Sequence, residues 1–353
     1  MNENKLKIIM FSSADSVAGQ GVGSAYEEQV RLVKEGAADL FDVEVNKWTE
    51  RCDIQHFHTI DPIFYLRMMN KNVLNVAYCH FLPDTLEGSL KFPKWMEDTV
   101  SSYVIRFYKS ADRLVVVNPS FIDELVKYGL DREKITYIPN FVSHEEFHPL
   151  PAETRKADRA EYGLKEDDFV VLGCGQVQTR KGVKDFVEVA KAMPDVQFVW
   201  AGGFSFGNIT DGYDELKAIM ENPPANVHFL GIVDRSRMVN IYNLSDVLFI
   251  PSYNELFPMT ILEAVNLSKP LVIRNLDLYR DILFDHYLKG ENNADFERLL
   301  RSLKDDPELF ARQSAESDKL SQFYSREHVL ELWKEFYTSA WQKKQKDLQK
   351  GLK

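Results

Sequence analysis

Two successive series of short apolar runs, separated by longer amphipathic stretches, constrain this chain more than any other feature. The first series covers residues 7–11, 41–45, 54–57, 73–78, 114–117 and 135–138, and the second covers 169–173, 196–200, 227–230, 247–250 and 270–273. Short apolar runs predict buried strands, and the helical patterns between them predict crossover helices. The pattern therefore predicts an α/β chain with two doubly wound parallel sheets.

The boundary between the two series lies near residue 148. Residues 144–160 lose apolar periodicity and contain Pro149 and Pro151, so we interpret this stretch as a linker. We expect a first Rossmann-like domain over residues 1–148 and a second over 149–325. A chain of 353 residues suits two domains, because single cores stop growing at about 250–300 residues. Residues 326–353 form one long helical pattern that ends in a run of lysines.

Charge and cysteine content exclude several classes of protein. The formal net charge is −11, whereas a nucleic-acid-binding domain is expected to be basic. Cys52, Cys79 and Cys174 are scattered and form no zinc-binding or disulfide pattern. The amino terminus is polar, and no apolar run approaches the ~20 residues of a membrane span. We therefore expect a protein of the cytoplasm or of its membrane face.

A loop and helix start in the second half carry two carboxylates. Residues 251–264 read PSYNELFPMTILEA, with Glu255 in the predicted loop after a strand and Glu263 in a helix that begins near Pro258. Strand carboxyl ends and helix amino termini face the ligand crevice of doubly wound folds. A carboxylate can accept hydrogen bonds from sugar or ribose hydroxyls. The alternative is that Glu255 caps the helix and Glu263 is an exposed helix charge.

A cationic loop follows the first strand of the second series. Residues 175–182 read GQVQTRKG, which places Arg180 and Lys181 where a helix opens. A planar guanidinium and a mobile ammonium both suit the charge that develops on a departing nucleotide phosphate. An ordinary solvated basic loop is the alternative.

Two weaker features lie in the first half. Gly19 to Gly23 form a glycine-rich turn whose backbone can approach a ligand, although a simple tight turn explains it as well. His80 follows a strand and can hydrogen-bond a sugar hydroxyl, or it is a satisfied structural histidine. His56 and His58 can face one side of a strand, but two histidines without a third ligand do not make a metal site.

Together these motifs resemble the family-4 retaining glycosyltransferases of the GT-B fold, over nearly the whole chain. Further segments that carry the resemblance read VNPS at 117–120, IPNFV at 138–142, GG at 202–203 and FLG at 229–231. The resemblance implies two Rossmann-like domains facing a central cleft. It also implies that the helix over about 326–353 crosses back to the first domain.

The resemblance also assigns roles to individual residues. Arg180 and Lys181 would bind the donor diphosphate. Glu255 would face the donor sugar hydroxyls, Glu263 would hold the nucleoside ribose, and His80 would lie beside the reacting sugar. The remaining implied donor contacts are the backbone of Phe257, Pro258, Met259, Thr260 and Ile261, and the loop at Gly21 and Gly23.

The reaction implied is that of a retaining, metal-independent hexosyltransferase with a UDP-sugar as donor substrate and no cofactor. Within the family the chain is similar to Gram-positive glycolipid synthases, through YCHFLPD at 78–84 and RNLDLY at 274–279. Such enzymes transfer galactose or glucose to an acceptor such as monoglucosyl-diacylglycerol, which gives a diglycosyl-diacylglycerol. Leu256 stands where the family usually has glycine, and residues 275–278 replace a glycine-rich turn. The donor sugar and the linkage therefore stay open.

A lipid acceptor requires contact with a membrane surface. Residues 89–111 combine aromatic and basic side chains, which predicts a helix in the headgroup region or, alternatively, one that faces the core. The lysine-rich carboxyl terminus would add attraction to anionic lipid. We expect a cytoplasmic protein, peripheral at the inner membrane face, with no nucleic-acid partner. The alternatives are the same chemistry on a polysaccharide precursor or small molecule, and a non-catalytic sugar-nucleotide-binding protein.

Overall fold

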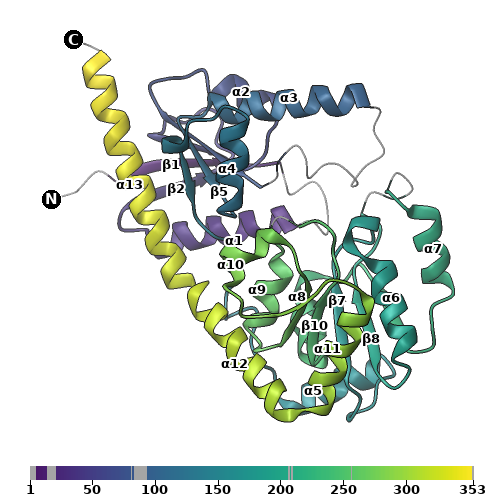
Figure 1. Cartoon of the computed structure of the whole chain (residues 1–353). Coiled ribbons are helices and arrows are strands. Elements are labelled where there is room, and N and C mark those ends of the chain that lie inside the picture. The colour runs from purple at the N-terminus through teal and green to yellow at the C-terminus, as the bar shows by residue number, and fades with distance from the viewer. Residues whose placement is uncertain are drawn as a thin grey trace. The chain divides into compact units, whose positions relative to one another are not determined.

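The computed structural model describes residues 5–13, 21–80, 82, 94–205, 207, 210–255 and 257–351. These residues form two compact units (Figure 1). Unit 1 holds the described residues up to 82, those from 94 to 141 and those from 325 onward, and unit 2 holds those from 142 to 324. Gly19, Leu256 and residues 89–93 of the predicted lipid-facing stretch lie outside the described residues.

Unit 1 is built on a parallel six-stranded sheet with strand order β2-β1-β3-β4-β5-β6. Its central strands are buried because helices cover a parallel sheet on both faces, which explains their unbroken apolar runs. Ile8 of β1 pairs with Val43 of β2 on one side and with Ile54 of β3 on the other. The strands are β1 (Leu6–Phe11), β2 (Phe41–Val45), β3 (Ile54–Phe57), β4 (Leu74–Cys79), β5 (Arg113–Val116) and β6 (Ile135–Tyr137).

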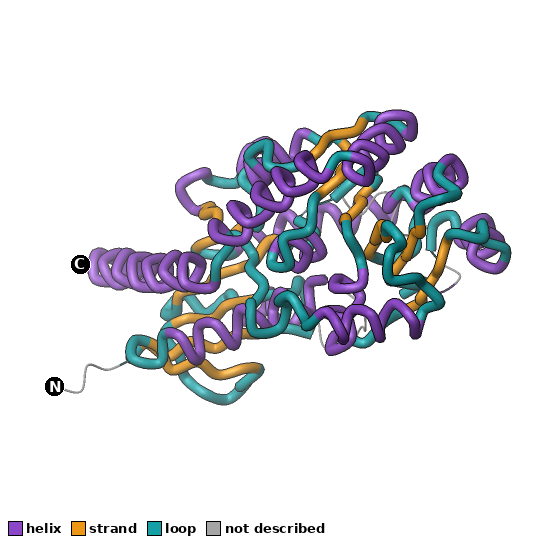
Figure 2. The backbone as a smooth tube through the Cα atoms, turned by 90° about the horizontal axis from the view of Figure 1, so that it is seen from below, coloured by secondary structure: helices purple, strands orange, loops and turns teal. Residues whose placement is uncertain are grey.

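The carboxyl-terminal helix α13 (Arg326–Gly351) belongs to unit 1, although its sequence follows that of unit 2 (yellow in Figure 1; the long helix at C in Figure 2). Trp333 and Tyr337 of α13 are fully buried. The Tyr337 hydroxyl lies 2.7 Å from Nδ1 of His56 and accepts a hydrogen bond from Gln29 of α1 at 3.3 Å. The other helices of unit 1 are α1 (Gly21–Gly36), α2 (Pro62–Arg67), α3 (Lys94–Ser110) and α4 (Ser120–Lys127).

Unit 2 repeats the architecture with a second parallel six-stranded sheet of order β12-β11-β10-β7-β8-β9. Phe186 of the helix after β7 packs against Phe198, Trp200 and Phe249 of the sheet, with ring centroids 5.1–5.7 Å apart. The strands are β7 (Val170–Cys174), β8 (Gln197–Ala201), β9 (Val227–Gly231), β10 (Val247–Ile250), β11 (Leu271–Arg274) and β12 (Leu288–Gly290).

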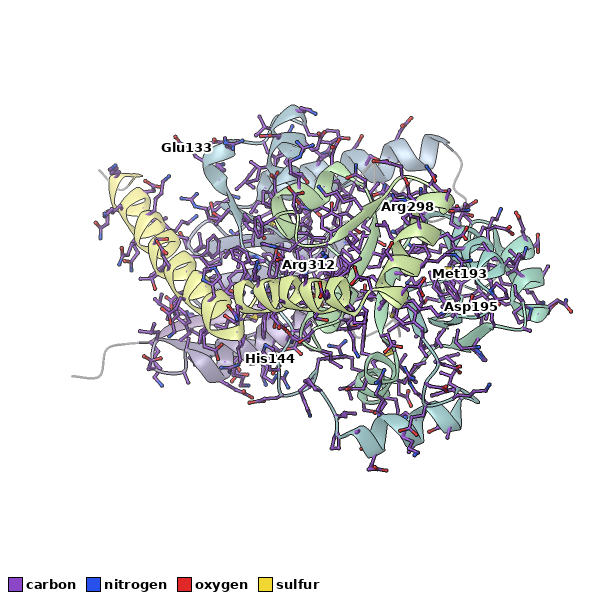
Figure 3. The ribbon with its side chains drawn as sticks, turned by 60° about the horizontal axis from the view of Figure 1, so that its bottom comes forward. Glu133, His144, Met193, Asp195, Arg298 and Arg312 are labelled. Carbon is purple, nitrogen blue, oxygen red and sulfur yellow. The ribbon has the colours of Figure 1, made fainter. Side chains whose placement is uncertain are left out.

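Polar contacts tie helices of unit 2 to neighbouring loop segments. Asp195, after α6, forms an ion pair with Lys304 of α11. Figure 3 labels Asp195 and also Arg298, which lies in α11. His144, also labelled, bonds Ser321 of α12 at 3.0 Å. These helices are α5 (Ala152–Glu161), α6 (Val183–Ala192), α7 (Tyr213–Glu221), α8 (Arg235–Leu244), α9 (Met259–Val265), α10 (Arg280–Leu283), α11 (Asn293–Asp305) and α12 (Pro307–Phe323).

The segment interpreted as a linker, residues 144–160, contains most of helix α5, and that interpretation was wrong for residues 152–160. Charged contacts rather than an apolar stripe hold this helix. Arg159 is 2% exposed, and its guanidinium donates to the carbonyl of Leu244 at 2.9 Å and to Asp246 at 2.9 Å. Arg155 adds a second ion pair to Asp246 at 2.5 Å. A hydrophobic pattern could not reveal a helix whose inward face is built from arginine.

The predicted fold is confirmed in its main features: both sheets are parallel and doubly wound, and the last helix packs on the first unit. Two local expectations change. The predicted glycine turn is partly helical, because α1 begins at Gly21 and includes Gly23. The described part of α3 faces the core, since Val104, Phe107 and Tyr108 are at most 2% exposed. This favours the core-facing alternative for that part of residues 89–111.

We predict that Trp333→Ala lowers the free energy of unfolding by roughly 3–5 kcal/mol, because it empties a buried site between α13 and the sheet. Urea denaturation of the full chain measures the loss. Glu335→Ala, an exposed position on the same helix, is the matched control and should change stability by less than about 0.5 kcal/mol. Equal stability of the two variants would show that α13 is not part of the unit 1 core.

Candidate functional site

Arg180 and Lys181 lie in a turn that only glycine can close. After β7 the chain enters the short 3-10 helix η4 (Thr179–Lys181), and Gly182 then adopts φ +69° before α6. A Cβ at Gly182 would lie 2.4 Å from the carbonyl oxygen of Pro251, at the end of β10. Because glycine has no side chain, the cationic turn can lie directly against the loop that carries Glu255.

Hydrogen bonds from both predicted cations join this turn to the loop after β10. The Lys181 ammonium donates to Oε1 of Glu255 at 2.5 Å. The Arg180 guanidinium donates to the carbonyl of Asn254 at 3.1 Å, and the N–H of Tyr253 donates to the carbonyl of Arg180 at 2.8 Å. The structure therefore brings together the two predicted cations and the first predicted carboxylate, at the carboxyl ends of β7 and β10.

The Lys181–Glu255 pair is almost completely removed from water, with side-chain exposures of 13% and 6%. Burial raises the pKa of Glu255, but the charges of Lys181 and Arg180 outweigh it and hold that pKa below its ordinary value. Burial also lowers the pKa of Lys181, and the attraction of Glu255 recovers only part of that shift. Glu255 is thus a firmly ionised carboxylate, and Lys181 is a cation that a further negative group would stabilise.

Glu263 lies in α9 and is also buried, with both carboxylate oxygens engaged. Oε1 forms an ion pair with Arg235, at the start of α8, and Oε2 accepts a hydrogen bond from the Tyr242 hydroxyl at 2.6 Å. The Arg235 guanidinium also lies over the ring of Phe147, 4.6 Å from its centroid. Glu263 is therefore a fixed acceptor rather than the exposed helix charge of the alternative interpretation.

Cys174 connects the surroundings of the two carboxylates. Burial raises the pKa of its thiol to about 12, with a further rise from the charge of Glu263 and an opposing effect from Lys181. The thiol therefore stays protonated, and it lies within electrostatic reach of both groups. Glu263 and Lys181 thus both act on the pKa of this one thiol of unit 2.

At the start of α9 the groups available to a ligand are backbone N–H groups, because most side chains there are buried. Phe257, Met259 and Ile261 are buried, and the ring of Phe257 packs on Tyr324 with centroids 5.3 Å apart. Pro258 precedes the first helical residue, Met259. The Ile261 N–H donates to the Pro258 carbonyl at 3.1 Å, whereas the N–H groups of Met259 and Thr260 have no carbonyl partner within the helix and suit an oxygen-rich ligand.

The remaining predicted site residues lie in unit 1. Gly21 and Gly23 occupy the first turn of α1, and His80 directly follows β4. His80 is part of a buried aromatic cluster, with its ring centroid 4.2 Å from that of Tyr78 and 6.0 Å from that of His58. Burial lowers the pKa of His80 to about 3, so its imidazole is neutral at physiological pH. The structural-histidine alternative for His80 fits this burial as well as a ligand contact does.

Two functional candidates escaped the sequence analysis. Arg235 and Tyr242 both hold Glu263, although nothing in their immediate sequence sets them apart. Arg235 follows shortly after β9, so the rule that strand carboxyl ends line the ligand crevice could have indicated it. Among the described residues, no group of three or more His, Cys, Asp or Glu side chains is placed to hold a metal ion.

The arrangement in unit 2 suits an anionic ligand that also carries hydroxyl groups. Cations and helix N–H groups can bind phosphate, while two ionised carboxylates can accept hydroxyl hydrogen bonds. The family model described as "Glycosyl transferases group 1" matches residues 154–319, and the model "Glycosyltransferase Family 4" matches residues 38–146.

Relatives and solved structures agree with these models. The chain is 47% identical to an alpha-galactosylglucosyldiacylglycerol synthase of Streptococcus pneumoniae, across 96% of this chain and 90% of that protein. It is 25% identical to a processive diacylglycerol alpha-glucosyltransferase of Acholeplasma laidlawii, across 84% and 88% of the two chains. An Anabaena protein, HepE, solved with UDP-glucose, is similar in fold, with a TM-score of 0.76, 14% identity, and coverage of 95% of this chain and 100% of that one.

The buried histidines His56, His58 and His80 predict that acid lowers the stability of the folded chain. Burial lowers the pKa of His56 and His80 to about 3, and that of His58 well below its ordinary value. Below about pH 6.5 the unfolded chain binds protons that these folded histidines do not bind, so acid favours unfolding. Each histidine should remove up to about 1.4 kcal/mol per pH unit.

The variant His58→Phe isolates one member of the cluster. Both ring nitrogens of His58 lack a hydrogen-bond partner among the described residues, so an apolar ring should be neutral or stabilising at pH 7.5. Urea denaturation at pH 7.5, 6.5 and 5.5 should show a smaller loss of stability in the variant than in the natural chain. Identical losses would mean that His58 is not neutral in the folded protein.

Proposed function

We propose a reaction for this chain from one premise: the chain belongs to the family-4 glycosyltransferases of the GT-B fold. The proposed reaction moves a hexose, galactose or glucose, from a UDP-sugar to a glycolipid such as monoglucosyl-diacylglycerol, which forms a diglycosyl-diacylglycerol. The observation that carries this proposal is the 47% identity, over nearly the full length of both chains, to a protein named for such a synthesis.

Lys181 and Arg180 are proposed to bind the donor diphosphate. Lys181 already lies against Glu255 in a site from which water is largely excluded, and because burial lowers its pKa, an additional anion beside it would favour its charged form. Negative charge develops on the leaving phosphate as the glycosidic bond breaks. Cations placed beforehand in a dry site stabilise that charge without reorganisation, which usually accounts for a large share of the rate enhancement.

Glu255 is proposed to bind donor sugar hydroxyls and Glu263 the ribose. Each carboxylate has about four lone-pair positions, and Glu263 uses one oxygen for Arg235 and the other for Tyr242. Both oxygens therefore retain capacity for the hydroxyls of a ribose. The backbone from Phe257 to Ile261 would contact the phosphate and sugar.

Unit 1 is proposed to be the acceptor-side domain, and unit 2 the nucleotide-sugar-binding domain. His80 would touch the reacting sugar as a neutral hydrogen-bonding group, because its pKa of about 3 prevents it from acting as a charged acid. Gly21 and Gly23 would present backbone N–H groups at the first turn of α1. We further propose that the anomeric configuration is retained and that the cations of unit 2 replace a metal ion.

The protein is proposed to work in the cytoplasm, peripheral to the inner membrane face. None of the helices in the described ranges is at once long and apolar enough to cross a bilayer. The alternative acceptors are a polysaccharide precursor or a soluble small molecule, and a non-catalytic sugar-nucleotide-binding protein is a further alternative.

Purified protein incubated with UDP-galactose or UDP-glucose tests the substrate class. We expect a lipid with one added hexose, detected by mass spectrometry, when monoglucosyl-diacylglycerol is supplied in detergent micelles. Soluble sugars should give no product. Transfer to soluble sugars alone would support the alternative acceptors, and UDP binding without any transfer would support a non-catalytic protein.

The site assignment predicts that Lys181→Ala and Glu255→Gln each reduce kcat by about 10²–10³-fold, because each removes an electrostatic contact in a buried site. Lys184→Ala is the matched control, since Lys184 lies one turn further along but is exposed and paired with Glu215. Its rate should change less than twofold. Near-normal rates in both site variants, with folding verified by circular dichroism, would contradict the assignment.

A further inference from the structure

Helix α2 exposes an apolar stripe on the surface of unit 1. Ile63 is 51% exposed, Leu66 is 58% exposed, and Met69, in the turn that ends the helix, is 70% exposed. Positions three apart lie on the same face of a helix. These three residues therefore form one continuous outward face, although water would favour polar side chains there.

Buried side chains on the inner side of α2 fix the orientation of this stripe. Phe64 and Met68 of the same segment are buried in the core, and Phe64 packs against Phe11 and Phe57 with ring centroids 5.7 and 5.6 Å away. Helix α2 also lies beside α3 (Figure 1), where the Tyr103 hydroxyl donates to the carbonyl of Ile60 at 2.5 Å. Because the inner side is fixed by packing, the apolar stripe cannot turn inward.

Trp48 extends this surface. Its indole is 45% exposed, and its ring stacks near Phe64 at a centroid distance of 5.8 Å. Arg67 of α2 lies over the same ring, 5.3 Å from its centroid, and donates to the Trp48 carbonyl at 2.9 Å. Half-exposed tryptophan beside arginine is typical of the region where a protein meets lipid headgroups.

The charges around the stripe favour an anionic partner. Lys47, Arg51 and Lys71 are exposed beside it in the sequence. The acidic residues of the same stretch are engaged within the unit: Glu50 pairs with Lys7, Asp53 accepts the Lys7 N–H at 2.8 Å, and Asp61 accepts the Ser13 hydroxyl at 2.7 Å. Within residues 47–71 the four basic side chains outnumber the three acidic ones, in a chain whose net charge is −11.

We propose that Trp48, Ile63, Leu66 and Met69, with the cations Lys47, Arg51 and Lys71, form a lipid-docking face that seats unit 1 on an anionic bilayer. The apolar side chains enter the interface between headgroups and acyl chains, and the cations meet lipid phosphates. The inference rests on the proposed glycolipid acceptor, because it supplies the means by which the enzyme reaches a substrate held in a membrane. It assigns the docking to α2, whereas the sequence indicated residues 89–111.

Vesicle binding tests the docking face directly. The full chain is sedimented with vesicles of phosphatidylcholine alone and with vesicles containing 30% phosphatidylglycerol (about one charged lipid in three). We expect binding to the anionic vesicles that falls at least tenfold in the triple variant Ile63→Ser, Leu66→Ser, Met69→Ser. The control Leu40→Ser, Val126→Ser changes two other exposed apolar side chains of unit 1 and should bind within twofold of the natural chain.

A charge-reversed variant, Lys47→Glu, Arg51→Glu, Lys71→Glu, should lose the preference for anionic vesicles. Undiminished vesicle binding by the triple variant would overturn the proposal. If the triple variant instead converts a dimer into a monomer in light scattering, with vesicle binding unchanged, the face is an interface between copies and the proposal also fails.

Activity separates failure of this inference from failure of the proposed function. With monoglucosyl-diacylglycerol in anionic vesicles, the triple variant should lose at least tenfold in turnover, while in detergent micelles it should match the natural chain. If the natural chain transfers no hexose in either medium, the proposed function fails. If it transfers hexose and the triple variant is equally active on vesicles, the docking face fails alone.

Discussion

The buried contact between Lys181 and Glu255 is the constraint on which the unit 2 site depends. A carboxylate with 6% exposure is costly to ionise without a partner, and removing one member of such a pair leaves an uncompensated buried charge. The contact in turn requires that the turn after β7 lie against Pro251, which Gly182 permits because it has no side chain. One glycine thus determines whether cations and carboxylate can share a site at all.

Glu263 is also buried and paired with a cation, but its partners come from another helix. Arg235 and Tyr242, both from α8, hold its two oxygens, so α8 and α9 are joined through a carboxylate that points into the unit. Two buried acids, each with its own cation, let unit 2 keep two negative charges fixed before any ligand arrives. A site organised in advance loses less entropy when the ligand binds.

Much of the architecture was readable from sequence, because parallel strands buried on both faces are unbroken apolar runs. The same reasoning placed Glu255 after a strand and Glu263 in the following helix, as the structure has them. The apolar pattern did not predict a helix that is held by ion pairs instead of apolar contacts. Helix α5 is held by Arg155 and Arg159 on Asp246, so it has no apolar stripe to detect.

Sequence could not separate inward from outward apolar residues on α2 and α3. Val104, Phe107 and Tyr108 of α3 pack in the core, whereas Ile63 and Leu66 of α2 face water. A helix as short as α2 spans too few turns for a period to be recognised, so only the packing of Phe64 reveals its orientation. Arg235 escaped for a related reason, since its role depends on a contact with a residue far along the chain.

The desolvated imidazoles of unit 1 limit how a proton can travel during the proposed transfer. A histidine whose conjugate acid has a pKa of about 3 releases a proton to water almost at once, so His80 cannot store the one lost by an attacking hydroxyl. A phosphate oxygen, whose second ionisation has a pKa near ~6, is a far better acceptor. The departing nucleotide would then serve as the base for its own displacement, and the protein's task would be to hold that oxygen close to the incoming alcohol.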